Sequence, residues 1–271
     1  MAVNEPARPL LRYPETIGRA TVRAVGEVGY GASLLGESLY WLFLGRSRRQ
    51  PVRVGSVFAQ MMEIGIRALP IVTILALTIG AMLAIQGIYT LRSFGAESRV
   101  VIGIAFSVTR EFAPLIVGIL VAGRSGSALS ARLGTMVISQ EVDALSVMGI
   151  NPVRFLVVPS FVAMVVMVPA LTLYADLVAL FGGGLYTAAE LGLSLAAYTD
   201  QTLAVLGVND LMHGLGKSLV FAVLITIIGV VNGFWVAPGA DGVGRATTRS
   251  VVLSIAAIIV TDMLFAFVVT K

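Results

Sequence analysis

The sequence predicts an all-α integral membrane protein with five transmembrane helices, and two observations lead to this fold class. Of the 271 residues, 57% are hydrophobic and only 13% are charged, whereas soluble domains carry about 25% charged residues. Five separate stretches approach the roughly 20 apolar residues that a helix needs to cross a bilayer. This composition excludes an ordinary soluble domain, a disordered chain and a nucleic-acid binder with a long basic face, so we expect no nucleic-acid partner.

Each predicted span is a long apolar stretch with few interrupting charges. Arg110 and Glu111 fall inside the second, Asp176 inside the third and Asp262 inside the fifth, whereas Lys217 falls near the start of the fourth. The small residues Gly182–Gly184 at the end of the third span, and Gly229 with Gly233 in the fourth, allow close helix approach, within the chain or between two copies. The expected spans are residues 68–91, 100–122, 155–182, 215–236 and 251–269.

The basic residues predict the orientation, because an excess of Lys and Arg marks cytoplasmic segments. Fourteen of the 19 Lys and Arg residues fall before the first span or in the segments after the second and fourth. The segment between the third and fourth spans, residues 183–214, contains no Lys or Arg and is predicted to be a long external loop. We therefore expect a multi-pass protein with a cytoplasmic N-terminus and an external C-terminus.

The N-terminal segment, residues 1–54, predicts an amphipathic helix lying on the cytoplasmic leaflet. Its first 20 residues contain three arginines and no apolar core, unlike a cleavable signal. From Val22 onward, apolar residues recur at the spacing of one helical face, and Glu27 and Glu37 lie off that stripe. A short first span over residues 28–44 is the alternative, which Glu37 and three glycines disfavour. The arginines expected to face lipid phosphates are Arg46, Arg48 and Arg49, and the stripe consists of Val22, Val25, Val28, Ala32, Leu35, Leu39 and Leu42.

The segment 123–152 is too polar to be a membrane span and predicts a short cytoplasmic helix. Ile138, Val142 and Leu145 share one helical face, while Glu141 and Asp143 point elsewhere. A short helix with one apolar face and acidic neighbours suits docking into a groove on a soluble partner. The alternative, a solvated turn without structure, is unusual at a length of 30 residues.

Four sequence blocks carry a resemblance to a known family. They read REFAPLIVGILVAGRSGSALSARLG, EVDALSVMGINPVRFLVVP, GKSLVFA and GVGRATTRSVV. Together they resemble the MlaE/YrbE permease family, the membrane subunits of ABC transporters that move phospholipids or other lipids. The similarity extends from about Ser56 onward, so the chain divides into an N-terminal segment, 1–54, and a permease domain, 55–271.

The resemblance implies an inner-membrane homodimer in which each copy binds a cytoplasmic ABC ATPase. It also implies an MCE-domain protein on the external side, which carries lipid between the permease and the opposite membrane. In such transporters a coupling helix follows the second span, and the match places it at residues 130–148. Its expected contacts with the ATPase are Glu141, Asp143 and Leu145.

The charges within the spans are candidates for a binding site. A charge at bilayer depth costs about 2.5–3.5 kcal/mol on insertion scales, so such residues usually pair or face a polar cavity. In the family, matching charged positions lie beside a central lipid cavity, which implicates Glu111, Lys217 and Arg110, the last beside a lipid phosphate. The alternatives are that these charges only hold helices together, or that Lys217 snorkels to the headgroups. The family architecture also implies that Leu83, Gln86 and Ile88 of the first span line the cavity, although the sequence alone equally allows a lipid-facing position.

Two other function classes compete with an ATP-driven permease. Asp176 and Asp262 would suit a proton-coupled secondary transporter, but that class predicts internal repeats, and none is found. The third hypothesis is a non-transporting membrane scaffold for an MCE-domain protein. Gly216–Ser218 matches the end of a P-loop, but Leu211 stands where its first glycine is required. We therefore expect no cofactor and no enzymatic activity in this chain, with ATP used by a partner subunit.

Overall fold

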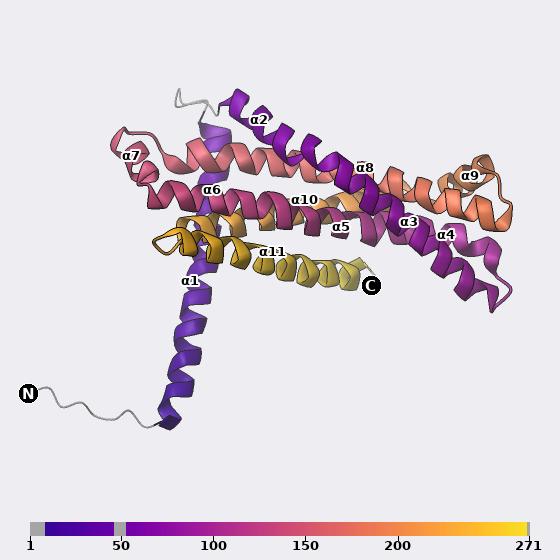
Figure 1. Ribbon diagram of the computed structural model, residues 1–271, viewed down its shortest axis with the longest axis horizontal. Coiled ribbons are helices and arrows are strands. Elements are labelled where there is room, and N and C mark those ends of the chain that lie inside the picture. The colour runs from indigo at the N-terminus through magenta and orange to yellow at the C-terminus, as the bar shows by residue number, and fades with distance from the viewer. Residues whose placement is uncertain (1–8, 46–52, 270–271) are drawn as a thin grey trace, which may run out of the picture.

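The computed structural model describes residues 9–45 and 53–269, and within these ranges the ordered elements are helical, with no strand. Figure 1 shows the long helices running side by side as a bundle, with α7 at one end and α9 at the other. We call these the α7 end and the α9 end. The helices are α1 (Pro9–Leu44), α2 (Val54–Ile64), α3 (Leu69–Arg92), α4 (Val100–Ser107), α5 (Ala113–Val121), α6 (Ser127–Ile138), α7 (Glu141–Val147), α8 (Val158–Leu191), α9 (Leu195–Val205), α10 (Val208–Phe234) and α11 (Ala240–Val269).

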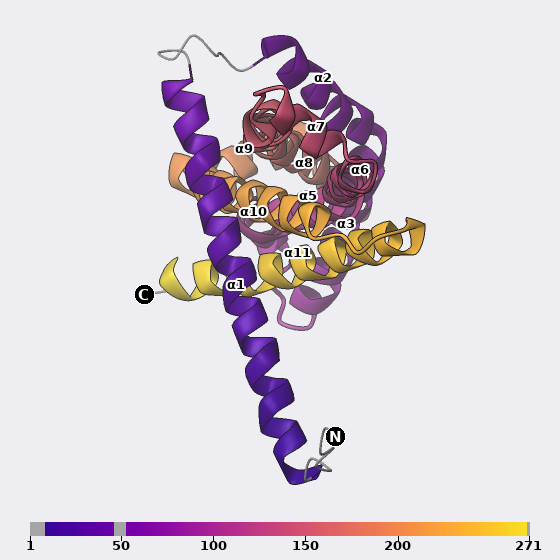
Figure 2. The same ribbon diagram turned by 90° about the vertical axis from the view of Figure 1, so that its left-hand side faces the viewer.

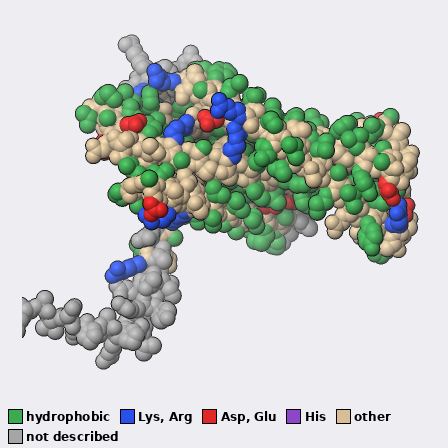
Figure 3. Space-filling model, viewed as in Figure 1, with side chains coloured by type: hydrophobic (Ala, Val, Ile, Leu, Met, Phe, Trp, Pro, Cys, Tyr) green, Lys and Arg blue, Asp and Glu red, His purple; other side chains and the backbone are tan. Residues whose placement is uncertain are grey.

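Five of the described helical segments are long and apolar enough to cross a membrane, which confirms the predicted fold class. The first joins α2 to α3 through a 3-10 turn, and the second joins α4, α5 and α6 through two π-helical turns. Charged side chains gather mainly toward the two ends of the face drawn in Figure 3, as expected for a multi-pass membrane protein. The five segments are Val54–Arg92, Glu97–Ile138, Val153–Leu191, Val208–Phe234 and Ala240–Val268.

The second span is longer than the sequence predicted, and this corrects the assignment of residues 123–138 to a loop. The helix continues through Gly123 to Ile138, because α6 packs against α10 and α11 and buries Leu129, Ser130 and Leu133. The predicted single helix over 130–148 is therefore divided. Its first part is the end of α6, and α7 follows after Gln140, which has a left-handed φ of 60°.

The predicted long external loop, 183–214, is also wrong in its extent. Helix α8 continues to Leu191, α9 occupies most of the interval and α10 begins at Val208. Tyr198 of α9 is 2% exposed because its ring packs against the backbone of Gly184 in α8. This contact allows the segment to fold back onto the bundle.

Close backbone contacts between α3 and α8 form the centre of the core. A Cβ atom on Gly80 would lie 1.8 Å from the carbonyl oxygen of Ala179, and one on Gly182 would lie 2.4 Å from that of Leu77. The glycine pair of the fourth span likewise serves packing within the chain, since a Cβ on Gly233 would lie 2.8 Å from Leu133 Cβ. These distances permit only glycine without a shift of the helices.

Helix α1 crosses the α7 end of the bundle rather than running along it (Figure 2). The residues expected to lie off its apolar stripe attach it to the bundle. Glu27 forms an ion pair with Arg249 at 2.7 Å, and Glu37 accepts a hydrogen bond of 2.7 Å from Asn151. The first part of the stripe points away, with Val22, Val25 and Val28 each at least 67% exposed, whereas Leu35 and Leu42 are half-buried. Arg46, Arg48 and Arg49 lie outside the described residues.

Candidate functional site

A buried lysine links three of the spans through ion pairs. Lys217 of α10 is 0% exposed, and its Nζ lies 2.5 Å from Glu111 Oε2 and 2.9 Å from Asp262 Oδ1. Glu111 comes from the second span and Asp262 from the fifth. With all three groups ionised, two carboxylates surround one ammonium and the cluster carries a formal charge of −1.

Lys217 does not snorkel to the headgroups, contrary to one of the predicted alternatives. Helix α10 begins at Val208 rather than near Leu215. Lys217 therefore lies nine positions after its first residue, about 14 Å along the helix at 1.5 Å per residue. The ammonium lies buried between the two carboxylates rather than extending toward the start of the helix.

Arg110 makes a separate ion pair at the start of α10. Its Nε and Nη2 atoms both donate to Asp210 Oδ1, at 2.8 and 2.5 Å, while Asp210 Oδ2 accepts the Gly207 N–H at 2.8 Å. The Arg110 guanidinium carbon also lies 4.5 Å from the centre of the Phe106 ring. The role of Asp210 was not predicted, because this residue falls in the segment 183–214 that the sequence indicated as an external loop. An aspartate three residues after Gly207 is a recognisable signal for a helix start.

A π-helical turn, Val108–Phe112, positions Arg110 and Glu111. Such turns insert an extra residue into a helix and occur frequently at functional sites. Gly214 of α10 approaches the turn so closely that a Cβ atom there would lie 2.2 Å from the Thr109 carbonyl oxygen. The turn therefore sends its two adjacent charges to different partners, Arg110 to Asp210 and Glu111 to Lys217.

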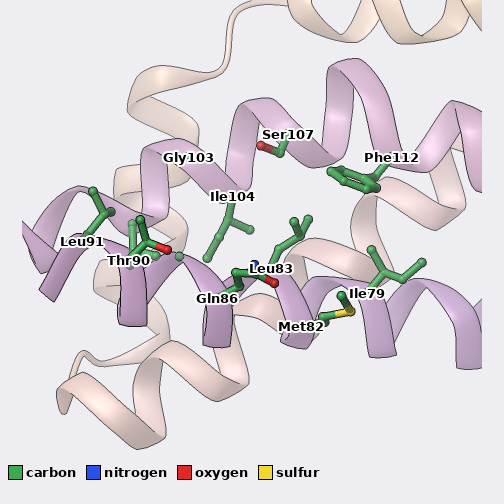
Figure 4. A pocket seen from close by; sticks show the side chains of 12 residues that line it. Ile79, Met82, Leu83, Gln86, Thr90, Leu91, Gly103, Ile104, Ser107 and Phe112 are labelled. Atoms are coloured by element: carbon green, nitrogen blue, oxygen red, sulfur yellow. The ribbon is translucent and has the colours of Figure 1, made fainter. Parts of the chain in front are cut away.

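An apolar pocket of about 560 Å³ lies beside this turn, between α3 and α4 (Figure 4). Leu83 and Gln86 line it, whereas Ile88 does not. Ile88 is only 2% exposed because it continues the buried stripe of α3 through Ala84. The lining residues are Ile79, Met82, Leu83, Gln86, Gly87, Thr90, Leu91, Val100, Gly103, Ile104, Ser107 and Phe112.

The π-helical turn contributes one residue to the pocket and another to the ion-pair cluster, although no side chain of the cluster lines the pocket. Phe112 lines the pocket and directly follows Glu111 in the chain. The Glu111 side chain is 40% exposed, whereas that of Asp262 is 17% exposed and that of Lys217 is fully buried. Glu111 is therefore the member of the cluster that solvent or a bound molecule reaches most easily.

Asp176 and Asp262, the aspartates within the third and fifth predicted spans, have different surroundings. Asp262 pairs with Lys217, so it is not an isolated intramembrane carboxyl group. Asp176 of α8 is 4% exposed, and its Oδ1 has no hydrogen-bond partner among the described residues. The structure does not bring Asp176 into the ion-pair cluster.

Helix α7 presents a mixed acidic and apolar surface. Glu141 and Asp143 are exposed, and Leu145 is half-buried and lines a hollow at the base of the helix. Val147 and Met148, which were not among the predicted contact residues, are 87% and 64% exposed. Adjacent exposed apolar side chains at a helix end are typical of a contact surface.

Several known proteins are similar to this chain in sequence. Residues 57–268 match the family model described as Permease MlaE. A probable ABC transporter permease protein of Rickettsia typhi is 32% identical over 94% of this chain and 96% of its own length. The intermembrane phospholipid transport system permease protein MlaE of Haemophilus influenzae is 31% identical over 90% and 92% of the two chains. The chloroplastic protein TRIGALACTOSYLDIACYLGLYCEROL 1 of Arabidopsis thaliana is 32% identical over 75% of this chain and 58% of its own length.

Proposed function

Because the chain belongs to the MlaE permease family, we propose that it is the membrane subunit of an ATP-driven phospholipid transporter. It acts as a homodimer in the inner membrane, with its N-terminus cytoplasmic. A separate ABC ATPase binds at the α7 end, and an MCE-domain protein binds at the α9 end. The observation that carries the proposal is the apolar pocket whose wall includes Phe112, the residue next to Glu111 of the Lys217 ion-pair cluster.

The pocket and the cluster match the two chemical parts of a phospholipid. Leu83 and Gln86 contact acyl chains in the pocket, where apolar surface is removed from water. Arg110, whose side chain is 41% exposed, binds the phosphate through its planar guanidinium. Glu111 forms the accessible edge of the cluster, so a headgroup ammonium or hydroxyl group bonds to its carboxylate.

Lys217 gives the cluster a mechanical role. Its single ammonium ties the second, fourth and fifth spans together. An alternating-access cycle must change the relative positions of such spans, and headgroup contact with Glu111 competes with the Lys217 pair. Lipid binding therefore weakens the Lys217–Glu111 ion pair and lets the second span move relative to the fourth and fifth.

Helix α7 transmits the ATPase cycle to the spans. Glu141 and Asp143 form polar contacts with the ATPase, and Leu145 anchors the apolar side of the same surface. Because α7 joins the second span to the third through short connections, a displacement of α7 moves both spans. ATP is hydrolysed only in the partner subunit, so this chain contributes no catalytic residue and needs no cofactor.

Transport in reconstituted vesicles tests the proposal. The permease and its ATPase are incorporated together with fluorescent phospholipid, and transfer to an acceptor MCE-domain protein is measured with and without ATP. We expect ATP-dependent transfer that Glu111→Gln reduces and that Glu190→Gln, a matched change in the exposed ion pair with Arg92, leaves intact. Transfer driven by a proton gradient without ATP would instead identify a secondary carrier, and MCE-protein binding without any transfer would identify a scaffold.

A further inference from the structure

A second pocket, which is polar and separate from the ion-pair cluster, lies between α2, α6 and α8 toward the α7 end of the bundle. Its volume is about 250 Å³, and its wall includes two arginines, Arg124 and Arg132, together with Glu63. On the face drawn in Figure 3, basic side chains surround an acidic one in the region of these helices. The three charged side chains give the pocket a formal charge of +1.

Both arginines leave donors unused inside this pocket. Arg124 Nη2 donates to the Glu63 carbonyl oxygen at 3.1 Å, and Arg132 Nη2 donates to Ser160 Oγ at 3.0 Å. Arg124 Nη1 and Arg132 Nε are buried, and no described residue accepts a hydrogen bond from either atom. Buried donors of a charged group are costly to leave unpaired. The pocket therefore presents two guanidinium groups that lack an acceptor, and such groups match phosphate oxygens in geometry and charge.

The pocket lies at the depth of lipid headgroups. The stretch from Val100 to Val121 contains 22 residues, or about 33 Å of helix at 1.5 Å per residue, which matches a hydrocarbon core of about 30 Å. Arg124 lies three positions after the end of that stretch. It comes 13 residues after Glu111, about 20 Å along the helix, so this pocket is distinct from the ion-pair cluster.

The outer face of α2 adds a surface for acyl chains. Val54, Phe58 and Met62 recur every four residues and are 66%, 63% and 57% exposed, while Gln60 and Glu63 of the same helix line the pocket. A ligand with a phosphate in the pocket therefore has apolar side chains beside it. We propose that Arg124 and Arg132 form a phospholipid headgroup site that binds the lipid phosphate. Basic pockets between transmembrane helices are known to bind lipid headgroups in this way.

Lipid retention by the purified full-length chain tests this site. The protein in detergent is incubated with dioleoylphosphatidylglycerol, and bound lipid is counted by native mass spectrometry. We expect Arg124→Gln/Arg132→Gln to weaken binding at least about tenfold, because charge-assisted hydrogen bonds are lost. The matched control, Arg99→Gln/Arg245→Gln, removes two positive charges from exposed positions and should bind as the wild type does. Equal binding by the two double variants would overturn the proposal.

Two further probes separate the phosphate from the rest of the lipid. Dioleoylglycerol has the same acyl chains without a phosphate and should bind weakly and without regard to the arginines. Inorganic phosphate that displaced the lipid completely at equal concentration would show that the pocket recognises a free anion, which overturns the lipid assignment. Glu63→Gln removes the carboxylate that interacts with Arg132, and we expect it to increase lipid retention, an effect that a purely structural pair of arginines would not produce.

Folding is controlled within the same experiment. Arg124→Gln alone replaces an only partly buried side chain, so it keeps the test valid if the double variant does not fold. Its retention should lie between those of the wild type and the double variant, and wild-type retention by a folded Arg124→Gln would contradict the proposal. Because binding is measured on the isolated permease, the result does not depend on whether ATP-driven transport is observed.

Discussion

Replacing Lys217 by methionine should destabilise the permease strongly, because it leaves Asp262 without its ammonium partner. Breaking a buried ion pair by removing one partner costs about 3–5 kcal/mol. We expect the lower end of that range, since the Glu111 side chain is 40% exposed and regains water, whereas Asp262 is only 17% exposed. For a chain of this size, about 3 kcal/mol corresponds to a decrease in Tm of roughly 6–12 °C.

The double variant Lys217→Met/Asp262→Asn distinguishes this explanation from a loss of side-chain packing. Removing the carboxylate charge along with the ammonium eliminates the unpaired buried ion, so the double variant should recover at least about 1 kcal/mol relative to Lys217→Met. Thermal unfolding in detergent, followed by tryptophan fluorescence, measures both variants. If the Tm of Lys217→Met equals that of the wild type, or if the second substitution lowers it further, the charge-pairing argument is refuted.

Three more predictions concern packing, partner binding and pH. Gly182→Ala should lower the Tm by an amount equivalent to about 1–3 kcal/mol, because the new Cβ would lie 2.4 Å from a carbonyl oxygen of α3. The control is Gly244→Ala, which should not lower the Tm because no atom lies within 4 Å of the new Cβ. Glu141→Lys should reduce copurification of the ATPase, and Asp200→Lys at the α9 end should leave it unchanged; equal recovery with both would exclude Glu141 from the contact. Burial raises the pKa of Tyr198 from 10.0 to about 12, so the stabilising effect of its neutral form is complete below pH 10 and is lost as the pH rises toward 12. Tyr198→Phe should therefore lose less Tm between pH 9 and pH 11.5 than the wild type does, and an equal loss would contradict this assignment.

The charges within the spans could be found from the sequence, but their partners could not. Arg110, Glu111 and Lys217 are visible as breaks in apolar stretches. Their pairing joins residues about 100 positions apart, Arg110 with Asp210 and Lys217 with Glu111. No local pattern encodes such a contact, because it depends on which helices pack together. For the same reason Asp210 was taken for a loop residue, and Lys217 was given a snorkelling alternative that the fold excludes.

Helix ends were predicted less well than helix interiors, again for a physical reason. A span is recognised by its apolar composition, which the bilayer demands at every residue. Beyond the bilayer, helix α6 continues because Leu129 and Leu133 pack against neighbouring helices, and hydropathy does not detect that contact. The burial of Ile88 could not be predicted for a similar reason, since apolar residues on opposite faces of α3 look alike in the sequence.

The sequence by itself determined the class of protein, the number of spans and the family, because bilayer insertion and the family motifs both depend on local stretches of residues. The tertiary structure alone decided which charges meet, which face of α3 lines the pocket and where Arg124 and Arg132 present their unused donors. Those properties arise from contacts between distant helices. The close approach of α3 to α8 at Gly80 and Gly182, and that of α10 to the π-helical turn at Gly214, fix the positions of these contacts.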